Sequence, residues 1–325
     1  MFFENGLYYI GKYKNGLRNG KGKIYYANGN IRFEGDYIND KTKGIGKFIW
    51  KDGACLVGQF KNELPYGKGK LYDPNGNIRF EGDYIYGKRE GIGKSIYEDG
   101  TYYIGQWKND FRNGKGKEYY ANGNIRFEGN YNDKREGIGK YFYEDGAYYI
   151  GQFKNDFANG NGKQYYPNGN IEFEGDFING KREGIGKFFY EDGTYYIGQF
   201  KNNLNHGKGK EYYANGIIRF EGDYYINGKR EGNGKYFYKD GSYYIGQFKN
   251  GLRNGKGKEY YANGNIQFEG DYINDKREGN GMIIYEDGSY YIGQFKNGLR
   301  NGKGIAYYTF GDIEFEGNWI NDVPL

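Results

Sequence analysis

The histidine at position 206 is the first residue whose type could do acid–base or metal chemistry. It lies in Asn205-His206-Gly207-Lys208, at a position where other copies of a repeated segment carry Asn or Glu. A nucleophilic triad or a metal site needs several partners that converge on one point. We therefore interpret His206 as a substitution in a loop, without a chemical role.

Recurrent carboxylates are the second candidate for chemistry, since one Glu returns in register at Glu34, Glu81, Glu128, Glu174, Glu221, Glu269 and Glu316. If four strands separate successive copies, they stand roughly 19 Å apart, whereas paired glycosidase carboxylates lie about 5 to 10 Å apart. They cannot act as a pair.

Two further motifs also fail as reactive or binding sites. Gly93-Lys94-Ser95 resembles the end of a phosphate-binding loop. That loop also requires a glycine five positions before Gly93, and this position is occupied by Lys88. Cys55 is the only cysteine, so no intrachain disulfide or cysteine-based metal site can form. The sequence predicts no enzyme, no cofactor and no metal.

The chain is organised instead by a glycine that returns with its neighbours every 23 or 24 residues. The fourteen anchors are Gly11, Gly35, Gly58, Gly82, Gly105, Gly129, Gly151, Gly175, Gly198, Gly222, Gly246, Gly270, Gly293 and Gly317. Self-similarity at such a period indicates stacked small units whose neighbours bury one another's faces. We expect one array over residues 1–325 and no separate catalytic domain.

The composition favours a sheet packed with aromatic side chains. The 325 residues include 60 Gly, 41 Tyr and 23 Phe but only 4 Pro, and they are poor in helix formers, which excludes helical solenoids. Disorder usually goes with few aromatic residues. Each aromatic ring can bury on the order of 150 to 250 Å², so a folded sheet is within reach.

Turn signals predict how the strands connect. Asn-Gly and Asp-Gly pairs, as in Ala27-Asn28-Gly29-Asn30, suit a tight hairpin tip with positive φ at two positions. The other connection, as in residues 109–113, is longer. Alternating tips and loops predict an all-β fold: an elongated, twisted, antiparallel single-sheet meander of stacked β-hairpins, on the order of 130 Å long.

Strand periodicity sorts the side chains into two faces. Tyr103, Gly105 and Trp107 point one way, and the glycines are expected to be gaps in which rings of neighbouring strands lie. The opposite face carries Tyr102, Ile104, Gln106 and Lys108. This mixed set suits either solvent or a partner that half covers it.

These motifs resemble a known repeat family. Tyr-x-Gly-x-Trp/Phe/Tyr, followed by Gly-x-Gly and a later aromatic residue, is similar to the MORN (membrane occupation and recognition nexus) repeat, and about fourteen copies cover nearly the whole chain. The second kind of copy, with Asn-Gly-Asn-Ile-Arg-Phe-Glu-Gly-Asp-Tyr, resembles the YwqK-like variant. The resemblance implies an open rod of hairpins that serves as a noncatalytic scaffold in cilia, cytoskeleton or membrane junctions, and it brings a proposal of phospholipid binding.

We expect proteins of a larger assembly to bind along the aromatic face, because repeat arrays present extended surfaces. The predicted anchors are Tyr103, Trp107, Tyr120, Phe127, Tyr131, Tyr149, Phe153, Tyr196 and Phe200.

A basic edge is the second predicted surface, formed by Lys108, Arg112, Lys115, Lys134, Arg135, Lys181 and Arg182, while the other edge is neutral to acidic. Such an edge could attach the protein to anionic phospholipid, including phosphoinositides. A net charge of +5, with Glu on the same loops, argues against nucleic acid. A third reading is a repeat that binds polysaccharide through stacked aromatic rings.

Location and self-association complete the expectations. The first residues lack a basic start followed by an apolar run, and no stretch is long and apolar enough for a membrane span. We expect a cytoplasmic protein associated with cytoskeleton, cilium or a membrane surface. The end strands have no evident cap, so homo-association through at least one of them is a further expectation.

Overall fold

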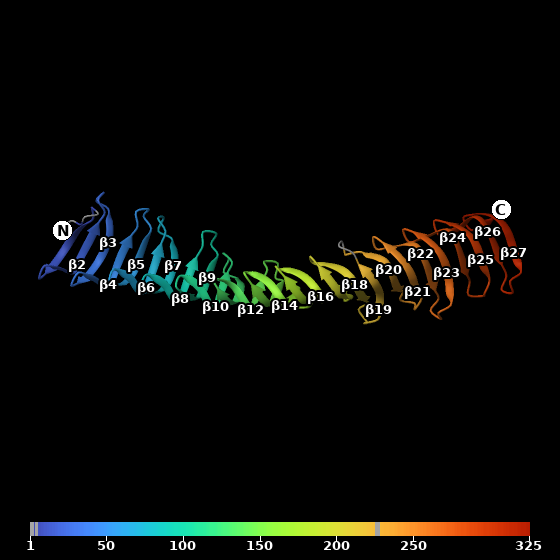
Figure 1. Ribbon diagram of the computed structural model, residues 1–325, viewed down its shortest axis with the longest axis horizontal. Coiled ribbons are helices and arrows are strands. Elements are labelled where there is room, and N and C mark those ends of the chain that lie inside the picture. The colour runs from blue at the N-terminus through green and yellow to red at the C-terminus, as the bar shows by residue number, and fades with distance from the viewer. Residues whose placement is uncertain (1–2, 4–5, 225–227) are drawn as a thin grey trace. The chain divides into compact units, whose positions relative to one another are not determined.

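The structure is a computed structural model that describes residue 3, residues 6–224 and residues 228–325 (Figure 1). These residues form 28 β-strands and no helix. They fall into two compact units, Met1–Asn159 with Tyr166–Asn168, and Gly160–Tyr165 with Gly169–Leu325. The predicted all-β class is confirmed.

The strands of the first unit follow one another in chain order. They are β1 Tyr8–Lys14, β2 Leu17–Tyr25, β3 Ile31–Ile38, β4 Lys41–Ile49, β5 Cys55–Lys61, β6 Leu64–Tyr72, β7 Ile78–Ile85, β8 Lys88–Ile96, β9 Tyr102–Lys108, β10 Phe111–Tyr119, β11 Ile125–Asn132, β12 Lys134–Phe142 and β13 Tyr148–Lys154. Each pairs antiparallel with the next, from β1 to β13.

The second unit repeats the pattern, and β14 Phe157–Tyr165 contributes residues to both units. Its further strands are β15 Ile171–Ile178, β16 Lys181–Phe189, β17 Tyr195–Lys201, β18 Leu204–Tyr212, β19 Ile218–Tyr224, β20 Arg230–Phe237, β21 Tyr243–Lys249, β22 Leu252–Tyr260, β23 Ile266–Ile273, β24 Lys276–Ile284, β25 Tyr290–Lys296, β26 Leu299–Tyr307, β27 Ile313–Ile320 and β28 Val323–Pro324. From β14 onward each strand pairs antiparallel with its successor, so the predicted meander of hairpins is confirmed.

The two kinds of connection are the reverse of the prediction. Asn109 and Asp110 alone join β9 to β10, with φ of 51° and 73°, the left-handed pair that a type I′ turn requires. The Asn-Gly connection from β10 to β11 spans residues 120–124, and among these only Gly123 has a positive φ. Its N–H donates to the carbonyl of Tyr120 at 2.9 Å, and the Tyr120 N–H donates to the carbonyl of Asn124 at 2.9 Å. The Asn-Gly pair therefore closes a wider loop.

The anchor glycines alternate with a second set of glycines, and together they form a row across the strands of each unit. Gly105 is in register with Gly116, and Gly116 with Gly129 on the next strand. The Tyr103 ring lies over the first two: a Cβ on Gly105 would stand 2.3 Å from the Tyr103 Oη, and one on Gly116 would stand 2.4 Å from the Tyr103 Cε2. The prediction that glycines make room for rings is confirmed.

The rings that lie on the glycine row form a connected core on one face, which we call the inner face. In the first unit, the Tyr103 ring meets the Trp107 ring edge-to-face at 5.5 Å and the Tyr131 ring at 5.0 Å. Phe127 continues the chain to Tyr131 at 5.5 Å and to Phe153 at 4.9 Å. Edge-to-face pairs of this kind add to the gain from burial, so neighbouring repeats stabilise one another through their rings.

Candidate functional site

Most of the predicted aromatic anchors are inside this core. The relative exposures are 0% for Tyr103, 6% for Trp107, 0% for Phe127, 3% for Tyr131, 2% for Tyr149, 5% for Phe153, 0% for Tyr196 and 3% for Phe200. Tyr120 is half-buried, and its hydroxyl donates to the carbonyl of Phe142 at 2.8 Å. The expectation that these rings lie open to a partner is corrected, because each of the eight buried rings already packs on glycine backbone or on another ring.

Arginines close the core at the edge of the two-residue turns. The guanidinium carbon of Arg112 lies 5.0 Å from the centre of the Tyr131 ring, and that of Arg135 lies 5.1 Å from the centre of the Phe127 ring. Both arginines hold Glu118: Arg112 donates to its Oε1 at 2.6 Å, and Arg135 donates to its Oε2. Glu118 is only 8% exposed, so two cations and one anion are withdrawn together from water.

The predicted basic edge is therefore smaller than the sequence indicates. Arg112 and Arg135 are bound to Glu118, and Arg182 donates to Glu172 while it covers the Phe188 ring at 4.6 Å. The lysines of the prediction, Lys108, Lys115, Lys134 and Lys181, are exposed. Sequence reasoning placed Arg and Lys together because it could not distinguish a cation that stacks inward from one that faces water.

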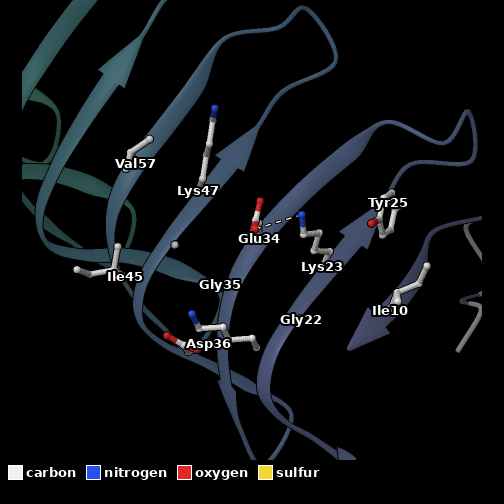
Figure 2. Close-up of a pocket in the computed structure, with 12 residues that line it drawn as sticks. Ile10, Gly22, Lys23, Tyr25, Glu34, Gly35, Asp36, Ile45, Lys47 and Val57 are labelled. Carbon is white, nitrogen blue, oxygen red and sulfur yellow. Dashed lines mark ion pairs between the residues drawn. The ribbon is translucent and has the colours of Figure 1, made fainter. Parts of the chain in front are cut away.

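A groove runs along the opposite, outer face, and sequence reasoning did not single it out as a site. Figure 2 shows its first part, with Gly22 and Gly35 as floor and with Lys23, Glu34 and Ile45 among its walls. This part encloses about 630 Å³. The next hollow shares Ile45 and Val57 with it and extends to Ile104, so the groove is continuous from β1 to β9.

We define the outer groove by the glycine row and the residues that directly flank it. The second unit has separate hollows of the same kind, one of them lined by Ile245, Lys258, Glu269, Asp271 and Met282 and enclosing about 880 Å³. The floor has no side chains because each glycine of the row that seats a ring on the inner face leaves bare backbone on the outer face.

Cross-strand ion pairs line one wall of the outer groove. In the first unit the Lys Nζ to Glu carboxylate distance is 3.2 Å for Lys23–Glu34, 3.0 Å for Lys70–Glu81 and 3.1 Å for Lys117–Glu128. The hydrogen bond to Glu81 raises the pKa of Lys70. These side chains are largely exposed, so the pairs contribute little to stability, and they set the charge pattern that a partner would meet.

Four lysines that flank the floor, Lys94, Lys140, Lys187 and Lys235, each lie over an aromatic ring on the same face. Lys94 Nζ stands 4.2 Å from the centre of the Tyr102 ring, and Lys140 Nζ stands 4.3 Å from the centre of the Tyr148 ring. Tyr102 is itself stacked on Tyr119, with ring centres 4.5 Å apart and planes at 10°. The ring faces beside the groove are therefore already in contact with one another or with lysine.

Reactive chemistry has little support in the described part of the chain. No group of three or more His, Cys, Asp or Glu that could hold a metal ion occurs among these residues. The Nδ1 atom of His206 is buried and has no hydrogen-bond partner. Burial raises the pKa of Tyr84 to about 12, away from the range in which a general acid or base works near neutral pH. None of the described residues forms a helix that is long and apolar enough to cross a membrane.

Comparison with known families bears on the whole chain. The family profile described as MORN repeat matches residues 9–31, 33–55, 80–102, 103–125, 128–148, 149–171, 173–195, 196–218, 220–243, 244–266, 268–290 and 291–312. The profile described as MORN repeat variant matches residues 65–86. No curated protein matches the chain.

Solved structures give distant likenesses. The wild-type TCP10 domain of Danio rerio CPAP is 12% identical with a TM-score of 0.21, over 79% of this chain and 98% of that one. A point mutant of the same domain gives 12% and 0.22, over 79% and 97%. A protein of unknown function from Bacteroides caccae gives 12% and 0.16, over 83% and 95%. At TM-scores this low, these likenesses support no conclusion.

Proposed function

Because the chain belongs to the MORN repeat family, we propose that it is a noncatalytic scaffold that binds protein partners of a larger assembly along its outer groove. The observation that carries the proposal is a set of apolar side chains that stand in water beside the glycine floor. Ile45 is 70% exposed, Ile92 56% and Ile138 69%. A repeated apolar feature in a groove is more informative than scattered exposed residues, because it marks surface that a partner can cover.

The proposal moves the binding surface from the inner to the outer face. A partner on the inner face would have to displace rings such as Tyr103, which is 0% exposed. A partner on the outer face meets apolar and charged groups without any rearrangement. By family analogy the assembly is cytoskeletal or ciliary and the protein cytoplasmic, and neither a cofactor nor a metal is needed.

Attachment to anionic phospholipid is the alternative, and it has fewer groups than the sequence indicated. Arg112, Arg135 and Arg182 are bound to carboxylates, which leaves lysines such as Lys134 to meet a membrane. Polysaccharide binding has less support still, because a sugar would need an exposed face of an aromatic ring. Tyr102 and Tyr119 are stacked, so each ring covers a face of the other.

Site-specific photo-crosslinking in the native complex tests the proposal. A photo-reactive residue in place of Ile92 should crosslink to protein, whereas the same residue in place of Lys134, exposed at the strand edge, should not. Crosslinks at position 134 alone would contradict the proposal. Flotation with phosphoinositide vesicles runs in parallel: salt-sensitive flotation together with no protein crosslink at position 92 would favour the membrane alternative.

A further inference from the structure

We infer that the outer groove of the first unit takes an extended, acidic protein segment with an apolar side chain at every sixth residue. The inference rests on the proposed function and specifies the partner. It follows from three features of the groove: the positions of its exposed isoleucines, their spacing and the charge between them.

Exposed isoleucines recur at regular intervals across the strands, and we call each such position beside the glycine floor a station. Ile45 on β4, Ile92 on β8 and Ile138 on β12 each precede a glycine of the floor by one residue. Ile92 is in register with Gln106, and Lys94 with Ile104, so Ile92 and Ile104 stand on opposite sides of the floor on adjacent strands. Ile104 is itself 37% exposed. At this station two apolar side chains therefore flank the glycine floor, one on each side.

The spacing between stations selects the conformation of the occupant. Four strands separate successive stations, which is roughly 19 Å along the groove. An extended chain rises about 3.3 Å per residue and covers this distance in about six residues, an even number that returns a side chain to the same face. Polyproline II, at about 3.1 Å per residue and three residues per turn, also needs about six, which is two full turns.

A helix does not fit the same stations. At about 1.5 Å per residue it needs about 13 residues between stations, and at 3.6 residues per turn this leaves successive apolar side chains about 0.4 of a turn out of phase. An amphipathic helix could therefore engage one station but not the next. The groove favours an extended occupant for this geometric reason.

The charge between the stations selects an acidic occupant. From β2 to β12, the two rows that flank the floor carry nine lysines, Lys21, Lys23, Lys47, Lys68, Lys70, Lys94, Lys115, Lys117 and Lys140, against five carboxylates, Glu34, Asp36, Glu81, Asp83 and Glu128. The net charge of these rows is +4. Ion pairs with Glu34, Glu81, Glu128 and Asp83 occupy four of the nine lysines, so cations remain to meet carboxylates of the occupant.

The chain also provides its own control for the stations. Lys-Arg-Glu-Gly-Ile-Gly around Ile92 is kept around Ile185 in the second unit, but it becomes Lys-Arg-Glu-Gly-Asn-Gly around Asn233 and Asn280. Both strands keep the register of the fold there, since Asn233 pairs with Gln247 and Asn280 with Gln294. Asparagine is therefore tolerated at a station, and Ile92→Asn removes an apolar contact without disturbing the sheet.

Binding of designed peptides to the full-length protein tests the inference. The probe is a labelled 18-residue peptide of Glu and Ser with Ile at every sixth position, measured by fluorescence anisotropy. We expect it to bind more tightly than the peptide with Ile at every fifth position, and the version with Lys in place of Glu not to bind. Ile92→Asn and Ile138→Asn should each weaken binding roughly tenfold.

Failure of this inference can be told apart from failure of the proposed function. Equal binding of the two spacings, no binding of the acidic probe, or unchanged affinity after Ile92→Asn and Ile138→Asn would overturn the inference. If the native complex still crosslinks at position 92 in that case, the scaffold function stands and its partner has another form. The second unit already has an exposed isoleucine at the equivalent position, Ile185. The reciprocal pair Asn233→Ile and Asn280→Ile should add two further stations there and increase the amount of probe bound at saturation.

Discussion

Replacing Gly116 by alanine should release the Tyr103 ring from the core. A Cβ at this position would stand 2.4 Å from both Cε2 and Oη of Tyr103, closer than real contacts allow. The backbone of Gly116 does not have a positive φ, so alanine itself is not strained there. The effect should therefore come from the ring alone.

The structure sets the size of this effect. Tyr103 is fully buried, and its hydroxyl donates to the carbonyl of Gln106 at 3.0 Å. A ring that shifts within the core costs about 1 to 3 kcal/mol, as overpacking usually does. A ring that is expelled exposes on the order of 200 Å², or about 5 kcal/mol at 25 cal/mol per Å². We expect a local loss of stability between about 1 and 5 kcal/mol, with the lower values for a shifted ring and the upper value for an expelled one.

Hydrogen exchange of individual strands is the appropriate measurement, because repeat arrays open locally and each repeat contacts only its neighbours. Gly116→Ala should speed exchange in β9, β10 and β11 and leave β3 and β4 unchanged. Gly123→Ala is the matched control: it meets only the Tyr102 hydroxyl at 3.9 Å, so it tests the strain of a positive φ of 88° without touching the core.

A double substitution decides whether the ring carries the effect. If Tyr103→Leu already removes the ring, adding Gly116→Ala should cost much less than it does in the natural protein. Additive losses, or unchanged exchange in β9 to β11 after Gly116→Ala, would refute the conclusion that the Tyr103 ring leaves no room for a Cβ at position 116.

Three further perturbations probe the core and its turns. Glu118→Ala leaves Arg112 and Arg135 buried without their anion and should cost about 3 kcal/mol by denaturant unfolding followed at β10 to β12, and a loss no larger than that of Glu118→Gln would count against a charged cluster. Asn109→Ala places a Cβ-bearing residue without a local polar side chain at a φ of 51° and should cost about 1 to 2 kcal/mol, while Asn109→Gly should be nearly neutral by the same measurement. Burial raises the pKa of Tyr84 from 10.0 to about 12. The contribution of the neutral Tyr84 side chain to the free energy of unfolding is therefore complete below pH 10 and is lost as the pH rises toward 12. Tyrosinate absorbance should then rise together with loss of strand signal in circular dichroism, and ionisation of the buried tyrosines well before unfolding would contradict this.

The repeat pattern predicts the strands, their two faces and the position of the rings, because the same packing of an aromatic ring over glycines recurs along the chain. The spacing of Tyr103, Gly105 and Trp107 predicts which side chains share a face, and the structure confirms both this face and the ring over the glycines. The turn types could not be assigned in the same way. Asn-Gly is compatible with a two-residue tip, but Asn109 and Asp110 also adopt left-handed φ, and only the strand register decides which pair closes the tight turn.

The candidate site was harder to predict, because the burial of a side chain depends on the residues that pack against it from adjacent strands. Alternation indicates that Tyr103 and Trp107 share a face, and it does not indicate that rings from adjacent strands cover that face completely. Without this closure, an aromatic face suggests a binding surface. With it, the same residues are a core, and the mixed face with Ile104 and Lys94 becomes the accessible one.

A signal for the inward-facing arginines is nevertheless present in the sequence. Glu118 occurs in the copy that has both Arg112 and Arg135, and Glu259 in the copy with Arg253 and Arg277, and each glutamate holds both of its arginines. Where Pro65 replaces the first arginine and only Arg89 remains, the equivalent residue is Leu71. Asn205 replaces the first arginine in a third copy, and there Glu211 pairs with Arg219 and Arg230. In each of these three copies the glutamate therefore neutralises two cations, as expected for a desolvated cluster and not for an edge of solvated charges.

A glycine of the floor links the two faces of the sheet and so links stability to the proposed binding. Gly93 seats the Phe80 ring on the inner face, where a Cβ would stand 2.4 Å from the ring, and on the outer face it is part of the groove floor between Ile92 and Lys94. Any side chain at this position therefore disturbs the core before it can narrow the groove. A change in binding without a change in stability has to come from the flanking rows, which is why Ile92→Asn, and not a glycine substitution, is the informative variant.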